Sequence, residues 1–179
     1  MDYIISQILT VIAFAFLGMT YVVKDRRKLL FFSLMASAVF IVSYFFLKAW
    51  SGLAMSAISL VRCGLFLIEN KKCEDRQMTK FGWFVLGTSI VALIICAVFT
   101  YEGFLSLFSV FGELIYTISI WQKNIKAYTI IGIGSTVLWT AYNIVIGSIV
   151  GIVLQALLLI IEIVGLLKTQ QPAILKEKE

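Results

Sequence analysis

The sequence contains no histidine, a single proline and few charged residues, and each scarcity excludes a class of protein. Only 14% of the 179 residues are charged, whereas 61% are hydrophobic and the mean hydropathy is +1.00. A soluble protein of this length needs more charged side chains to cover its surface. The absence of histidine removes the commonest general base and the commonest metal ligand. We therefore expect a membrane protein with no metal site and no cofactor.

Motifs for catalysis are equally scarce. The three cysteines, Cys63, Cys73 and Cys96, show no paired spacing, so they indicate neither a disulfide framework nor a cysteine metal site. No two acidic residues have a catalytic spacing, and no nucleophile is accompanied by a base. The sequence predicts that the protein is not an enzyme.

Long apolar runs make up most of the chain. Each run has about 17 to 21 residues, the length that a helix needs to cross roughly 30 Å of hydrocarbon. None of them alternates with the period of two that marks the strands of a membrane barrel. The sequence predicts an all-α polytopic membrane protein with seven transmembrane helices, at about Tyr3–Val23, Leu29–Leu47, Gly52–Ile68, Phe81–Phe99, Phe104–Trp121, Ala127–Ile146 and Ile149–Leu167.

Basic residues gather in the loops of one side. They lie in the turn "KDRRK", between Lys71 and Lys80, at Lys123 and Lys126, and in the tail, whereas the opposite loops contain Lys48 alone. This bias predicts an N-terminus outside and a C-terminus in the cytoplasm. The net charge of +5 then serves to orient the chain and to contact anionic lipid, so we expect the bilayer, and not nucleic acid, as the partner.

The two halves of the chain share one layout. Each half has a span, a basic turn, a second span with a tyrosine near its far end (Tyr44, Tyr142), a very short turn and a third span, at an offset of about 98 to 100 residues. Because one further span separates the halves, both begin outside and the repeats are parallel, in a 3+1+3 plan. We predict a first three-helix bundle at 1–70, a cytoplasmic loop and linker helix at 71–102, and a second three-helix bundle with a cytoplasmic tail at 103–179.

Two stretches and one charge resemble a known family. The segments "QILTVIAF" and "LWTAYNIVIGSIVG", with Arg62 in the third span, resemble the YgjV-type bacterial inner-membrane proteins over nearly the whole chain. The wider architecture is similar to that of the SWEET (MtN3-like) sugar facilitators and the PnuC vitamin-precursor transporters. The resemblance implies two bundles around a substrate site near the membrane midplane. The chain departs from it at Ser59, where the family often has asparagine, and at its proline, Pro172, because SWEET proteins have prolines inside their spans.

Three ionisable residues, Arg62, Glu113 and Glu162, lie deep within predicted spans. A charge at the bilayer centre costs roughly 2.5 to 3.5 kcal/mol on insertion scales, so each must face protein or water. We expect Arg62 to pair with one acid, and we expect the spare acid, favoured as Glu113, to titrate or to contact a solute. In the alternative interpretation, Arg62 only ties the bundles together and the second acid is hydrogen-bonded to hydroxyl groups.

Trp139 and Asn143 lie one helical turn apart, ahead of a tight turn at Gly147-Ser148. A carboxamide above an aromatic ring suits a neutral, ring-shaped solute that forms hydrogen bonds. Alternatively, Asn143 bridges helices and Trp139 packs against small residues such as Gly132 or Gly134. Similar polar stripes on neighbouring spans predict a substrate-binding site made of Trp139, Asn143, Glu113, Arg62, Ser59, Gln155 and Tyr116.

The sequence favours a transporter. In this hypothesis, a facilitator or proton-linked carrier moves a small polar solute, of nucleoside or vitamin type, by rocking two bundles around the midplane site. The alternative is a non-transporting receptor or a partner subunit of the same fold. Either protein could assemble as a homo-oligomer.

Overall fold

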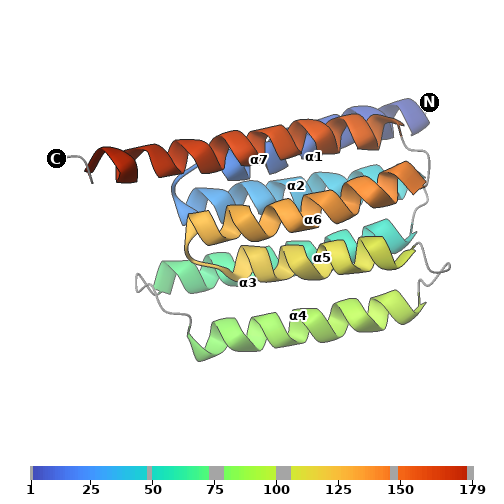
Figure 1. Ribbon diagram of the computed structural model, residues 1–179. Coiled ribbons are helices and arrows are strands. Elements are labelled where there is room, and N and C mark those ends of the chain that lie inside the picture. The colour runs from blue at the N-terminus through green and yellow to red at the C-terminus, as the bar shows by residue number, and fades with distance from the viewer. Residues whose placement is uncertain (1, 48–49, 73–78, 100–105, 146–148, 177–179) are drawn as a thin grey trace.

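A computed structural model describes residues 2–47, 50–72, 79–99, 106–145 and 149–176. Within these ranges the chain is all-helical, as predicted, and the helices lie side by side with nearly parallel axes (Figure 1). The predicted turn at Gly147-Ser148 lies outside the described residues. The seven helices are α1 (Asp2–Val22), α2 (Arg26–Leu47), α3 (Trp50–Lys72), α4 (Lys80–Phe99), α5 (Ser106–Trp121), α6 (Ile125–Val145) and α7 (Ile149–Lys176).

Within the described ranges, length and composition allow five of these helices to cross a membrane, and α5 adds a shorter apolar segment, Leu107–Trp121. The five spans are Ile4–Val22, Arg26–Phe46, Gly52–Glu69, Lys80–Phe99 and Val150–Leu167. Large apolar side chains point outward along them, such as Phe84, which is 66% exposed. Such an exterior is stable against lipid and would aggregate in water.

The two basic turns end in matched helix caps. The side-chain oxygen of Asp25 accepts a hydrogen bond of 2.9 Å from the backbone N–H of Arg27, and that of Asn124 accepts one of 2.9 Å from Lys126. These caps satisfy N–H groups that lack partners at a helix start. They explain why α2 and α6 begin two or three residues before the predicted apolar runs do.

The helices form a ring in chain order. Helix α2 packs between α1 and α3, and α6 packs between α5 and α7. Contacts between α1 and α7 and between α3 and α5 close the ring, while α4 packs outside it against α3 and α5 (Figure 1). Helices α1 and α5 run in the same direction (Figure 1), which gives the predicted parallel 3+1+3 arrangement.

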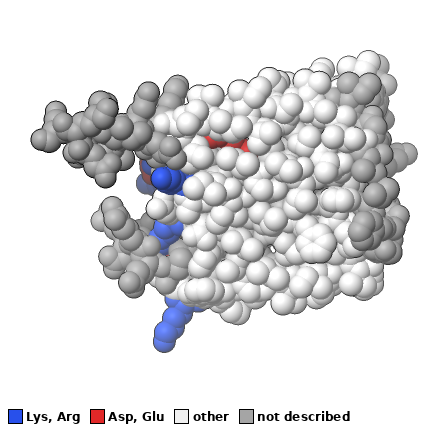
Figure 2. Space-filling model, in the orientation of Figure 1, with Lys and Arg blue, Asp and Glu red and all other residues white. Residues whose placement is uncertain are grey.

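One end of the ring is basic and tightly packed. Lys and Arg side chains gather at this end, and the rest of the visible face is almost free of charge (Figure 2). The buried hydrophobic cluster lies toward the same end. Tyr21 and Ile120 belong to the last turns of α1 and α5, and Leu29 and Tyr128 belong to the first turns of α2 and α6. The opposite half of the ring is therefore the one that can hold an open interior.

Candidate functional site

A cavity of about 400 Å³ lies inside the ring. Side chains from α1, α2, α3, α5, α6 and α7 line it, whereas the described residues of α4 contribute none. Its volume falls within the range of roughly 300 to 1,000 Å³ that is usual for small-molecule sites. The ring of six helices therefore encloses one site between the two repeats.

Twenty of the 27 residues that line the cavity form ten pairs, and the members of each pair are 99 positions apart, as are Phe14 and Glu113. The pairing places equivalent positions of the two repeats around one space, which is what parallel repeats related by an axis along the membrane normal produce. The chemistry within a pair often differs, so the cavity has two unlike walls. The pairs are Thr10 with Ser109, Phe14 with Glu113, Leu17 with Tyr116, Ala36 with Ser135, Ser37 with Thr136, Phe40 with Trp139, Tyr44 with Asn143, Gly52 with Gly151, Ser56 with Gln155, and Ser59 with Leu158.

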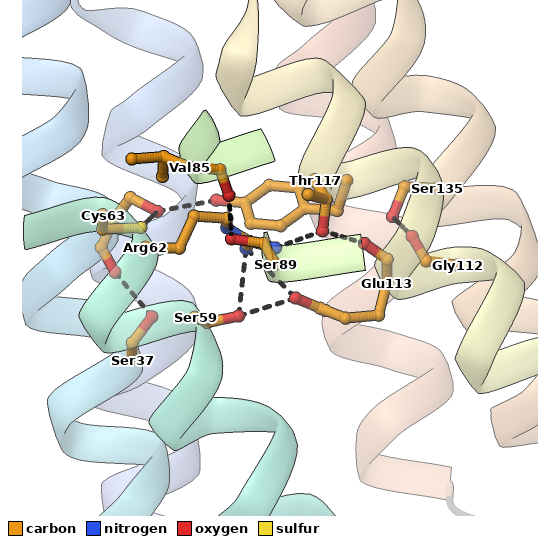
Figure 3. Close-up of polar contacts among 12 residues, drawn as sticks. Ser37, Ser59, Arg62, Cys63, Val85, Ser89, Gly112, Glu113, Thr117 and Ser135 are labelled. Atoms are coloured by element: carbon orange, nitrogen blue, oxygen red, sulfur yellow. Dashed lines mark hydrogen bonds and ion pairs between the residues drawn. The ribbon is translucent and has the colours of Figure 1, made fainter. Parts of the chain in front are cut away.

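Arg62 holds Glu113 in place from behind the cavity wall. Figure 3 shows Arg62 of α3 reaching Glu113 and Thr117 of α5, with Ser59 beside them. Arg62 Nη2 lies 3.1 Å from Glu113 Oε1 and donates a 3.0 Å hydrogen bond to Ser59 Oγ, which in turn donates one of 2.6 Å to Glu113. Arg62 is 1% exposed and does not line the cavity, whereas Ser59, Glu113 and Tyr116 do. Arg62 is thus a positioning residue.

This arrangement corrects one prediction. Arg62 pairs with an acid, as expected, but that acid is Glu113, so the expectation that Glu113 is the spare carboxylate is wrong. The sequence could not separate the two acids because both lie at similar depth. The order of the helices in the ring determines which acid pairs with Arg62. Helix α3, which carries Arg62, contacts α5, which carries Glu113, whereas α7, which carries Glu162, packs against α1 and α6.

Trp139 and Asn143 both line the cavity, as predicted. The Asn143 side-chain nitrogen donates a 2.9 Å hydrogen bond to the carbonyl of Trp139 in the same helix, so this contact does not bridge helices. A backbone carbonyl can only accept, and the bond therefore fixes which end of the carboxamide is the oxygen. This bond leaves the amide oxygen of Asn143 available as an acceptor.

The indole of Trp139 packs against Gly112 of α5. A Cβ atom at Gly112 would lie 2.9 Å from Trp139 Cδ1, closer than real contacts allow. The alternative that Trp139 packs against a small residue is therefore borne out, but the residue is Gly112. Gly132 lies against the hydroxyl of Tyr21, and Gly134 lies against Ile115. Gly112 admits an aromatic side chain, and Ser135 Oγ donates a 2.7 Å hydrogen bond to its carbonyl (Figure 3).

Of the two polar residues predicted on the last helix, one lies in the cavity wall and the other lies behind it. Gln155 lines the cavity and is 6% exposed, and its Oε1 has no hydrogen-bond partner among the described residues. Glu162 is fully buried and does not line the cavity. Its Oε1 accepts a 2.5 Å hydrogen bond from Thr136 Oγ1.

Sequence reasoning predicted Ser59 of α3 but missed the part of the wall that α1 and α2 contribute. Gln7 and Thr10 of α1, and Ser33 and Ser37 of α2, line the cavity. The sequence did contain a signal for them: Gln7 and Thr10 are three residues apart and Ser33 and Ser37 are four apart, so each pair lies on one face of its helix. Isolated hydroxyl groups within apolar runs are a weak signal, because they also bond to their own helix, as Ser37 Oγ does to the carbonyl of Ser33.

The chain belongs to the Imp-YgjV family, described as bacterial inner membrane protein, whose profile matches residues 4–172. It is therefore a multi-pass protein of the bacterial inner membrane. Comparisons with curated proteins and with solved structures give no match.

No group of three or more His, Cys, Asp or Glu in the described ranges could hold a metal ion.

Proposed function

We propose that this inner-membrane protein is a transporter that moves a small polar solute by rocking two three-helix bundles around the central cavity. The observation that carries the proposal is the cavity of about 400 Å³ between the repeats, lined by equivalent positions of both. Two similar halves around one site can expose it to either side by exchanging their conformations. The same plan underlies the proposed likeness to SWEET and PnuC proteins.

The lining favours a ring-shaped solute of nucleoside or vitamin type. Phe40 and Trp139 stand at equivalent places on α2 and α6, and each offers an aromatic surface to the cavity. Near them are the amides of Asn143 and Gln155 and the carboxylate of Glu113. Sites for such solutes combine aromatic surface with a few polar groups that fix orientation.

The two ends of the ring differ as a transporter requires. The lining reaches Gln7, Tyr44 and Asn143, close to the helix ends opposite the basic end. At the basic end, the Tyr21 ring stacks on that of Tyr128 with centroids 5.0 Å apart, and Tyr128 forms a 2.7 Å hydrogen bond with Thr20. This conformation is closed at the basic end. We propose that the basic end faces the cytoplasm and that the N-terminus lies outside.

The first test is the melting temperature of the purified protein in detergent with nucleosides, vitamins, sugars and small acids. A solute at 100 times its dissociation constant stabilises the folded state by about 2.7 kcal/mol, which a melting curve resolves. We expect a heteroaromatic compound to raise the melting temperature. Asn143→Ala should remove this shift while retaining the fold, and Val137→Ala, which alters a lipid-facing position of the same helix, should preserve it.

One outcome would contradict this proposal, and another would change the variant that tests it. If no compound in the panel shifts the melting temperature, the receptor or partner-subunit alternative becomes the better one. If Asn143→Ala fails to fold while Val137→Ala folds, Asn143 has a structural role, and Glu113→Gln becomes the variant that tests the site.

A further inference from the structure

The two acids of the membrane interior are stabilised in different ways. Glu113 has a cationic partner, Arg62, and accepts a second hydrogen bond from Ser59. Glu162 is 0% exposed and accepts one hydrogen bond, from Thr136. Its Oε2 is buried and has no partner at hydrogen-bonding distance in the part of the chain that the structure describes. The same residues provide no ion pair for Glu162.

The groups that face Glu162 come from each helix packed against α7. Helix α6 contributes Thr136 and Tyr128, and α1 contributes Tyr21 beside the carboxyl group. The ionisable groups among these are the two tyrosines, which are neutral phenols when buried. No described Lys or Arg balances a negative charge here. An ionised carboxylate would therefore be an uncompensated charge in an apolar interior, which is strongly unfavourable.

Glu162 is nonetheless close to the cavity. Thr136, which bonds to it, lines the cavity, and so do Tyr21 and Leu158, one helical turn before Glu162. The carboxyl group thus lies one side chain behind the wall. Water or solute that displaces the Thr136 hydroxyl would reach it directly. In the first repeat the position 99 residues earlier is Cys63, so only the second repeat has this acid.

We infer that Glu162 is a proton-binding site linked to the cavity through Thr136 and Tyr21, and that transport is proton-linked. The coupling rests on the proposed function, whereas the proton site can be tested alone. In the conformation described, the neutral acid accepts the Thr136 hydrogen bond on its carbonyl oxygen. When the wall opens, the O–H bond of Glu162 breaks, the proton passes to cavity water, and a carboxylate remains until water on the other side returns a proton. Proton release and solute occupancy thus alter the same wall, which couples them.

Infrared spectroscopy of the purified protein tests the proton site directly. A carboxylic acid has a carbonyl stretching band that a carboxylate lacks, and solvent-exposed acids are ionised at neutral pH. We expect the wild-type protein and Glu113→Gln to show this band at neutral pH and Glu162→Gln to lack it. Thr136→Val should retain the band at higher wavenumber, because the carbonyl oxygen loses its donor. A band that is unchanged in Glu162→Gln and in Thr136→Val would overturn the inference, as would its loss in Glu113→Gln alone.

A second experiment tests the coupling in vesicles that contain the protein and an internal pH-sensitive dye. The solute is the compound that most raises the melting temperature in the panel. We expect its entry to acidify the lumen with wild-type protein, and Glu162→Gln to exchange solute without moving protons. Equal solute entry without acidification in the wild type would overturn the coupling. A Glu162 infrared band without any solute uptake would instead contradict the proposed function and leave the proton site standing.

Discussion

Arg62 of α3 and Glu113 of α5 join the two repeats through an ion pair of 3.1 Å at the wall of the cavity. The guanidinium is buried behind the wall and also contacts Thr117 and the ring of Tyr116, with Cζ 5.5 Å from its centroid. One charged pair therefore fixes the carboxylate that lines the cavity and ties the two bundles together. Both roles lead to measurable consequences.

Replacement of either partner alone should destabilise the protein more than replacement of both. Arg62→Met leaves a buried carboxylate without its cation, and removal of one partner of a buried pair typically costs about 3 to 5 kcal/mol. The double variant Arg62→Met with Glu113→Gln leaves no unpaired charge, so we expect it to recover at least half of that loss. Melting temperatures of the three variants in one detergent measure the difference. Strictly additive losses would show that the pair does not act as a unit.

Gly112→Ala should disturb the site, because the new Cβ would lie 2.9 Å from Trp139 Cδ1 and 3.0 Å from its Nε1. Overpacking of this kind costs about 1 to 3 kcal/mol and would displace the indole from the cavity wall. The matched control is Gly87→Ala in α4, whose Cβ would meet nothing within 4 Å. We expect Gly112→Ala, and not Gly87→Ala, to lower the melting temperature and to abolish the rise in melting temperature that the solute causes. Identical behaviour of the two variants would contradict the packing of Trp139 on Gly112.

Arg26→Ala should open the basic end. The Arg26 guanidinium at the start of α2 donates hydrogen bonds to the carbonyls of Ile120 (3.1 Å), Trp121 (3.3 Å) and Gln122, so it links the first repeat to the end of α5. Such charged hydrogen bonds are worth about 1.5 to 3 kcal/mol, and a loss of about 1.4 kcal/mol raises the open fraction roughly tenfold.

The thiol of Cys63, fully buried in the hydrophobic cluster near this end, reports that opening. In a Cys73→Ser, Cys96→Ser background, we expect Arg26→Ala to increase the rate of Cys63 alkylation about tenfold. Arg27→Ala, which alters an exposed neighbour, should leave the rate unchanged. Equal rates in both variants would show that Arg26 does not hold the end closed.

The orientation of the chain can be tested at Lys126, an exposed residue at the basic end. With the three native cysteines replaced by serine, Lys126→Cys should react with a membrane-impermeant thiol reagent in inside-out vesicles and not in intact cells. A peptide tag added before Asp2 should bind its antibody on intact spheroplasts and should not bind it in sealed inside-out vesicles. Reaction of Lys126→Cys in intact cells would reverse the proposed topology.

The sequence by itself determined the membrane class, the number of helices and their parallel repeat. These features depend on run length, hydropathy and the position of charges, which are properties of local sequence. The residual differences lie at helix ends, as at Asp25 and Asn124, because a cap extends a helix into polar sequence that hydropathy does not count. The face of each helix that carries Ser59, Gln155 or Asn143 also followed from helical periodicity.

Only the tertiary structure decided which of these faces meet. The order of the helices around the ring pairs Arg62 with Glu113 and leaves Glu162 with Thr136. It also places Trp139 on Gly112, and it brings Phe14 and Glu113 to equivalent positions on opposite walls. Side-chain spacing fixes neighbours along one helix, whereas contacts between helices depend on how whole faces pack, and that is settled by all the helices together.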